Sequence, residues 1–154
     1  MINYSILCKS NHWPRRLKKI DKIIQKVLVY EKELKFTNTS NYFCNFVLAN
    51  DKFIKKLNNK YKKNNKPTDV LTFVSNYNVK DVKKEKHCDI IFSIERITQD
   101  SKNNNIDFYN HITHLIIHSF LHINNFIHYK LKDFFIMKKI ETKILKKLGI
   151  QDPY

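Results

Sequence analysis

Apolar positions recur along the chain at two spacings, and each spacing predicts a different kind of element. Short apolar runs rich in β-branched and aromatic residues, bounded by polar segments, predict strands. The predicted strands cover residues 2–8, 43–49, 70–74 and 89–92. Elsewhere apolar residues return every three or four positions, which is the pattern of an amphipathic helix. Helices are predicted to begin at Pro14, at Asn50 or Asp51, and at Ser93, and to cover residues 106–123 and 131–148.

Residues with known preferences for helix ends support these boundaries. Pro14 has the fixed φ of a first helical residue, and Asn50 or Asp51 can cap the next helix. Gly149 is suited to end the last helix, because glycine adopts a left-handed conformation readily. The chain has no internal repeat, no linker rich in Pro, Gly or Ser, and no break in composition. We therefore expect a single α+β domain over residues 1–154, with about four strands in a mixed sheet packed with about five helices.

Composition narrows the class of protein. With 154 residues, of which 42% are hydrophobic, the chain can bury a core and does not have the composition of a disordered protein. No apolar run reaches the roughly 18 residues of a membrane span, and the N-terminal segment lacks the features of a signal peptide. Cys8, Cys44 and Cys88 are odd in number and far apart, so we expect reduced, buried thiols without a disulfide partner. These features favour a cytoplasmic protein, with an organelle matrix as the alternative.

The net charge indicates a class of partner. It is +15, from 29 Lys and Arg against 14 Asp and Glu, which favours a polyanion such as nucleic acid. Lys, Asn and Ile are all heavily used, however, and Gly149 is the sole glycine. AT-biased codon usage produces the same pattern, so charge alone supports RNA or DNA binding only weakly.

Three histidines in a short segment provide the clearest chemical signal. His118 and His122 are four residues apart, which places both rings on one face of a helix of about 3.6 residues per turn. His128 follows Asn124 and Asn125, and asparagine tolerates the left-handed conformation that closes a helix and reverses the chain. Three neutral imidazoles without a fourth protein ligand in the segment are typical of a catalytic zinc site, since structural sites close all four positions. We therefore predict one Zn²⁺ per chain, on the histidine helix and the turn after it.

Other roles for the histidines stay open. Histidines recur at helical spacing from His111 to His122, so some of them could be polar-tipped residues on a half-buried helix face. His114 and His118 also form an i, i+4 pair. Because His114 lies one turn before the others, we expect it to support a ligand or the core rather than to bind the metal. His111 is expected on the helix surface.

Three sequence blocks resemble the YbeY family of metal-dependent single-strand endoribonucleases. Residues 66–73, KPTDVLTF, resemble the family's KPTDVLSF segment, and residues 88–93, CDIIFS, are similar to its GDIVIS strand. Residues 114–128, HLIIHSFLHINNFIH, resemble its HLxVHGxLHLxGYDH signature. The end of the chain is also similar to that of the family, at Met137, Glu141, Ile144, Leu148, Gly149 and Asp152-Pro153-Tyr154.

The resemblance implies a function as well as a fold. It implies a zinc-dependent endoribonuclease acting on ribosomal RNA, in 16S-type 3′-end maturation and ribosome quality control, with the small ribosomal subunit as partner. It also places Lys62 at the position of a catalytic basic residue, and Asp69 is a candidate to orient a histidine or a water. Lys63, Lys66 and Thr68 are expected to hold the RNA backbone. The alternatives are a solvated loop for the lysines and a backbone-capping role for Asp69 and Thr68.

The chain departs from the family pattern at four positions. Ser119 and Asn125 replace glycines, and Ile127 replaces an aspartate that could orient a ligand or a water. Lys62 replaces an arginine, which keeps the charge but loses the bidentate grip on phosphate. These replacements keep a second function open, a ribosome-assembly factor that binds RNA and whose metal is structural.

The histidine spacing is shared with metzincin proteases, which makes a zinc peptidase the third candidate. Those enzymes place a glutamate directly after the first histidine as general base, whereas this chain has Ser119, which cannot take a proton near neutral pH. A zinc held by neutral histidines keeps its full charge and suits an anionic phosphodiester better. The attacking group, water or the RNA 2′-hydroxyl, stays open, and a 2′,3′-cyclic phosphate product would exclude direct attack by water.

Overall fold

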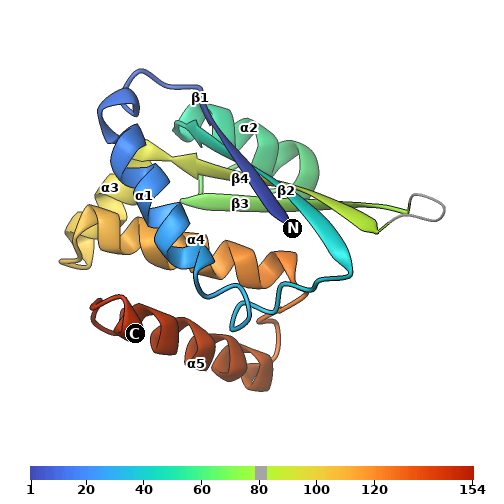
Figure 1. The fold of residues 1–154 in the computed structure, drawn as a ribbon. Helices are drawn as coiled ribbons and strands as arrows, with labels where there is room; N and C mark the ends of the chain where they lie inside the picture. The colour runs from blue at the N-terminus through green and yellow to red at the C-terminus, as the bar shows by residue number, and fades with distance from the viewer. Residues whose placement is uncertain (79–82) are drawn as a thin grey trace.

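A four-stranded sheet lies at the centre of the molecule (Figure 1). The computed structural model describes residues 1–78 and 83–154. The strands are β1 (Ile2–Cys8), β2 (Ser40–Ala49), β3 (Val70–Tyr77) and β4 (Lys84–Ser93), in the spatial order β1-β2-β4-β3. β1, β2 and β4 are parallel, and the edge strand β3 runs antiparallel to β4. The helices are α1 (Leu17–Leu28), α2 (Asp51–Lys62), α3 (Ile94–Asn103), α4 (Phe108–Ile123) and α5 (Leu131–Lys147).

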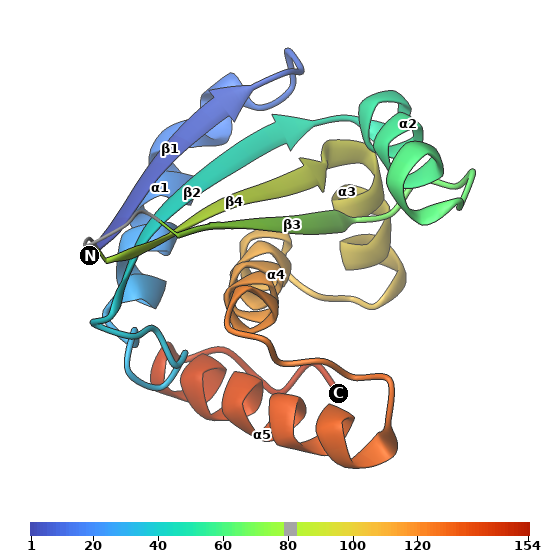
Figure 2. The ribbon, with the colours of Figure 1, turned by 90° about the vertical axis from the view of Figure 1, so that its right-hand side faces the viewer.

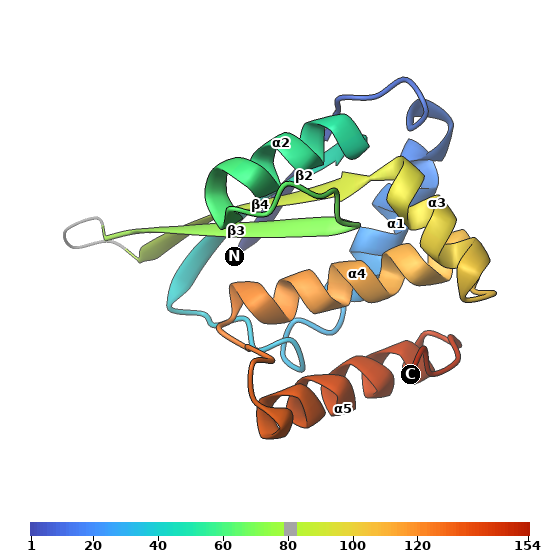
Figure 3. The ribbon, with the colours of Figure 1, turned by 180° about the vertical axis from the view of Figure 1, so that it is seen from behind.

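The two faces of the sheet build two hydrophobic cores of unequal size. Side chains of β2 alternate, so that Tyr42, Phe46 and Leu48 enter the larger core while Val47 and Ala49 enter the smaller one. α2 packs on the side of the smaller core, and α1, α4 and α5 lie on the other side (Figures 2 and 3). α4 lies between the sheet and α5 (Figure 2), so apolar side chains are buried around most of its circumference.

The predicted α+β class, with a mixed sheet of four strands and five helices, is confirmed. Asn50 is the residue that caps α2, since its side chain accepts a hydrogen bond of 2.9 Å from the backbone N–H of Phe53. The last predicted helix ends as expected at Gly149, whose φ is +75°. Within the described residues, no helix is both long and apolar enough to cross a membrane.

Element boundaries differ from the predictions mainly where polar residues join a strand. β3 extends to Tyr77 and β4 begins at Lys84, so the polar stretch expected over 76–87 partly pairs in the sheet; residues 79–82 of that stretch lie outside the described residues. The end of β3 and the beginning of β4 carry mostly exposed side chains, and backbone hydrogen bonds rather than burial hold them together. Their sequence therefore lacks the apolar pattern from which a strand is predicted. α4 begins at Phe108, because the Asp107 side chain accepts hydrogen bonds from the N–H groups of the first turn.

Candidate metal centre

A tight turn after α4 brings the third histidine back toward the helix. Asn125 has a φ of +67°, and the N–H of Phe126 donates to the carbonyl of Leu121 at 3.0 Å. The N–H of Asn125 donates to the carbonyl of His122 at 3.0 Å, which completes a Schellman motif with asparagine in the usual glycine position. The chain therefore reverses directly at the helix end, as the sequence predicted for these asparagines.

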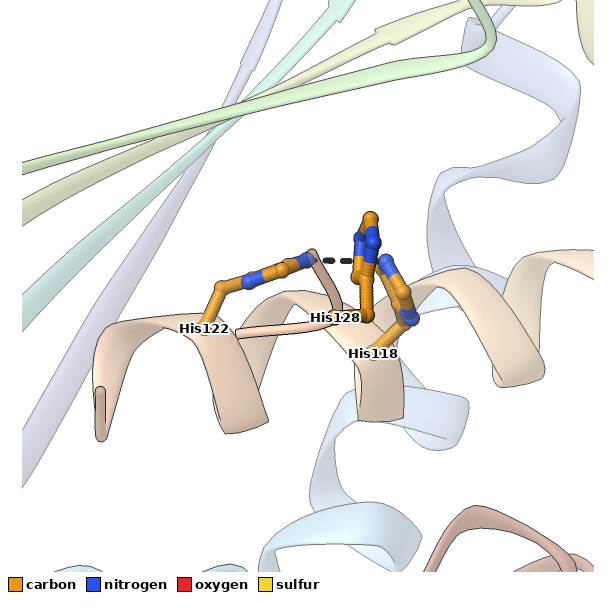
Figure 4. A group of neighbouring side chains, drawn as sticks. All are labelled: His118, His122 and His128. Atoms are coloured by element: carbon orange, nitrogen blue, oxygen red, sulfur yellow. Dashed lines mark hydrogen bonds between the residues drawn. The ribbon is translucent and has the colours of Figure 1, made fainter. Parts of the chain in front are cut away.

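The turn places His118, His122 and His128 around one point (Figure 4). One ring nitrogen from each lies within 4.8 Å of the other two. The ring of His128 lies 5.4 Å from that of His118 and 5.0 Å from that of His122, measured between centroids. The predicted ligands are thus brought together by one helix and the segment that follows it.

Hydrogen bonds fix which nitrogen of each helical histidine faces this point. Nδ1 of His122 lies 2.8 Å from the carbonyl oxygen of Phe126, which can only accept, so Nδ1 carries the proton. Nδ1 of His118 lies 2.6 Å from Oε1 of Glu141, a carboxylate oxygen that can only accept, so Nδ1 of His118 is a donor. The two Nε2 atoms face each other, 2.9 Å apart (dashed line in Figure 4).

The neutral state of His122 follows from its surroundings. Burial, and after it the neighbouring His118, lower the pKa of His122 to about 4. The neutral His122 ring can offer its Nε2 lone pair to a cation at this point. The donor set therefore fits Zn²⁺, which binds neutral imidazole readily and takes three histidines in catalytic sites.

Glu141 of α5 is the main feature of the centre that sequence reasoning did not assign to the site. Its side chain is fully buried, and its carboxylate accepts hydrogen bonds from His118, from Nε2 of His114 at 2.9 Å and from the hydroxyl of Tyr154. Burial raises the pKa of Glu141, but the donors His114, His118 and Tyr154 outweigh it and bring the pKa to about 2. A carboxylate in the apolar stripe of α5, one turn after Met137, was the signal in the sequence that could have revealed it.

The same contacts define the surroundings of His114 and Tyr154. His114 bonds to the carboxylate that holds His118, one step away from the three histidines. His114, His118 and Glu141 also lie close enough to form a second possible ligand group. Because both Glu141 oxygens already accept hydrogen bonds, the arrangement favours a supporting position for His114. Burial, and then the hydrogen bond to Glu141, raise the pKa of Tyr154, so its hydroxyl stays a donor.

Asp69 lies away from the three histidines. It approaches α4 beside His111, in the first turn of that helix. The distance from Asp69 Oδ2 to His111 Nε2 is 3.9 Å, and Asp100 completes this separate group. His111 precedes His118 by seven residues, about 10 Å along a helix. Asp69 also accepts from the backbone N–H of Val70 at 2.8 Å, which is the capping role considered as its alternative. The predicted surface position of His111 is wrong, because its side chain is only 12% exposed and burial lowers its pKa more than Asp69 raises it.

The basic residues of the α2–β3 connection are exposed and lie apart from the histidines. Lys62 is the last residue of α2, the helix on the opposite side of the sheet from α4 (Figure 3), and Lys63 follows it with a φ of +56°. The side chain of Asn58 donates to the carbonyl of Lys66 at 2.8 Å and so holds the connection against α2. Thr68 is partly buried and its hydroxyl donates to Asp69 at 3.2 Å. α2 and α4 are thus separated by the sheet, of which β3 is an edge strand.

Two of the departures from the family pattern occupy different environments. Ser119 is fully buried, and its hydroxyl has no hydrogen-bond partner among the described residues. Its side chain therefore points into the core and offers no base to the centre. Ile127 is 48% exposed and lies in the turn that carries His128.

Comparisons with known proteins find relatives that match most of the chain. The family model described as "Endoribonuclease YbeY" matches residues 6–149. A protein of that name from Ehrlichia canis is 41% identical over 111 residues, covering 70% of this chain and 68% of the relative. Namesakes from Anaplasma phagocytophilum and Pelagibacter ubique are 34% and 31% identical and cover 92% and 95% of this chain, and 90% and 95% of their own lengths. The solution structure of TM1509 from Thermotoga maritima shares the fold, with a TM-score of 0.57, 22% identity and coverage of 97% of this chain and 92% of that one.

Proposed function

Because the chain belongs to the YbeY family, we propose that it is a zinc-dependent endoribonuclease that cuts single-stranded RNA. Its proposed role is 16S-type 3′-end maturation and ribosome quality control. The observation that carries the proposal is the convergence of one ring nitrogen each from His118, His122 and His128, with the Nε2 atoms of the first two 2.9 Å apart.

His118, His122 and His128 are the proposed zinc ligands. When bound, zinc would polarise a phosphoryl oxygen and make an oxygen nucleophile more acidic. Since the three donors are neutral, the site keeps a positive charge and attracts an anionic phosphodiester. Glu141 and the Phe126 carbonyl hold two of the rings so that their Nε2 atoms stay directed at the centre.

The remaining predicted residues have proposed roles toward the RNA. Lys62, with Lys63 and Lys66, would neutralise phosphates of a strand that passes around β3. Thr68 and Asp69 directly precede β3 and would set the path of the RNA strand toward α4. Asp69 would act through its neighbour His111 rather than on a zinc ligand.

The proposed partners are ribosomal RNA and the small ribosomal subunit, in the cytoplasm. The net charge of +15 supports a polyanionic partner. The three free cysteines, two of them buried, suit a reducing compartment.

Metal analysis combined with an RNA cleavage assay tests the proposal. We expect one zinc per chain and cleavage of single-stranded RNA, with both lost in His118→Ala and both kept in His12→Ala, a matched change at an exposed histidine. Full zinc loading without cleavage of several RNAs would instead favour a ribosome-assembly factor. Chelator-sensitive hydrolysis of casein would favour a peptidase.

A further inference from the structure

The segment after α5 folds back along that helix and returns to the metal centre. Gly149 allows the reversal, since the N–H of Ile150 donates to the carbonyl of Leu145 at 2.9 Å and that of Gly149 to Lys146 at 3.0 Å. The following residues run back between α4 and α5 (Figure 2). The N–H of Tyr154 then donates to Asp152 Oδ1 at 2.9 Å, which fixes the final turn.

Several contacts hold the Tyr154 ring beside His114 and α5. The ring meets His114 edge to face at 5.5 Å and Phe134 at 5.8 Å between centroids. The ammonium of Lys138 lies 4.7 Å from the ring centroid, within the range of a cation–π contact. The ring is therefore held on several sides, although the residue as a whole is 48% exposed.

The hydroxyl of Tyr154 completes the hydrogen bonds of Glu141. It donates to Oε2, the same oxygen that accepts from His114, while Oε1 accepts from Nδ1 of His118. Three donors thus hold the buried carboxylate of Glu141, and both of its oxygens contribute to the position from which it orients His118. Without the hydroxyl, Oε2 keeps only His114, so one hydrogen bond fewer holds the carboxylate in the position that orients His118.

We propose that Tyr154 is a positioning residue of the metal centre, acting through Glu141 on His118. This inference rests on the proposed role of His118 as a zinc ligand. Partners of a metal-bound histidine typically contribute about 10- to 100-fold in metal affinity. Tyr154 stands one hydrogen bond further out, so its effect belongs at the lower end of that range.

A double-mutant cycle on zinc affinity tests the proposal without depending on RNA cleavage. The dissociation constant is measured by chelator competition for the wild type, Tyr154→Phe, Glu141→Gln and the double variant. We expect Tyr154→Phe to weaken zinc binding about 10-fold and Glu141→Gln about 100-fold. In the Glu141→Gln background, the tyrosine change is expected to add less than about twofold, because the two residues act in series. Tyr61→Phe, at an exposed tyrosine of α2, is the matched control and should bind as the wild type does.

The outcomes separate this inference from the proposed function. Unchanged affinity in Tyr154→Phe, or a full tenfold loss repeated in the Glu141→Gln background, would overturn the role of Tyr154 alone. A wild type that does not bind zinc, or that binds it equally well as His118→Ala, would overturn the metal centre itself. Circular dichroism of each metal-free variant establishes that the compared proteins are folded.

Discussion

Replacing Ser119 by alanine is expected to stabilise the protein. The Ser119 side chain is completely buried in α4, and its hydroxyl has no hydrogen-bond partner among the described residues. A buried hydroxyl without a partner costs about 1–3 kcal/mol, and the better helix propensity of alanine adds up to about 0.5 kcal/mol. We therefore expect a gain of about 1–3 kcal/mol in the free energy of unfolding.

Urea unfolding monitored by circular dichroism measures this difference. A chelator is present throughout, so that metal bound to the folded state does not contribute. The midpoint should rise with an unchanged m-value, and the melting temperature should rise by about 2–4 °C for each kcal/mol. Ser101→Ala is the matched control, since Ser101 is also buried in a helix but donates to the carbonyl of Ile97 at 2.7 Å. A Ser119→Ala variant no more stable than the wild type, or a control that gains as much, would refute the reasoning.

Four further predictions concern the turn, the buried histidine, the metal and the RNA surface. Asn125→Ala should cost about 1–2 kcal/mol in stability, because alanine is strained at positive φ; Asn125→Gly should not, and equal stability of the two variants would contradict this. Burial lowers the pKa of His111, so the unfolded chain takes up its proton first as the pH falls through about 6.5 and stability declines; the loss between pH 7.5 and 5 in urea titrations should be smaller in His111→Asn. Zinc at a hundredfold excess over its dissociation constant should stabilise the wild type by about 2.7 kcal/mol in thermal melts and His128→Ala by much less, whereas equal gains would remove His128 from the ligand set. Lys62→Ala should lower the slope of log affinity against log salt for single-stranded RNA by about 0.7, and an unchanged slope would show that Lys62 makes no phosphate contact.

Local sequence signals predicted the elements and the histidine cluster because the physics that forms them is local. Asn50 caps α2 through a bond three residues away, and Gly149 ends α5 through bonds to the preceding turn. The three proposed ligands likewise lie within eleven residues, on one helix and the turn after it.

The features that sequence did not predict depend on contacts between distant segments. Glu141 reaches His118 only because α5 packs against α4, and Tyr154 reaches Glu141 only because the chain reverses after Gly149. His111 similarly meets Asp69, just before β3, and Asp100 of α3 only because both segments approach α4. Periodicity along one segment carries no information about such encounters.

The position of α4 between the sheet and α5 affects how a cation would be captured. His118 and His122 are mounted on a helix confined from both sides, and hydrogen bonds already orient their rings. Coordination would therefore restrict little beyond the exposed segment that carries His128. Most of the conformational entropy lost on metal binding would therefore come from the segment that carries His128. The rate of metal release should accordingly follow the opening of the turn after α4 rather than any motion of the helix.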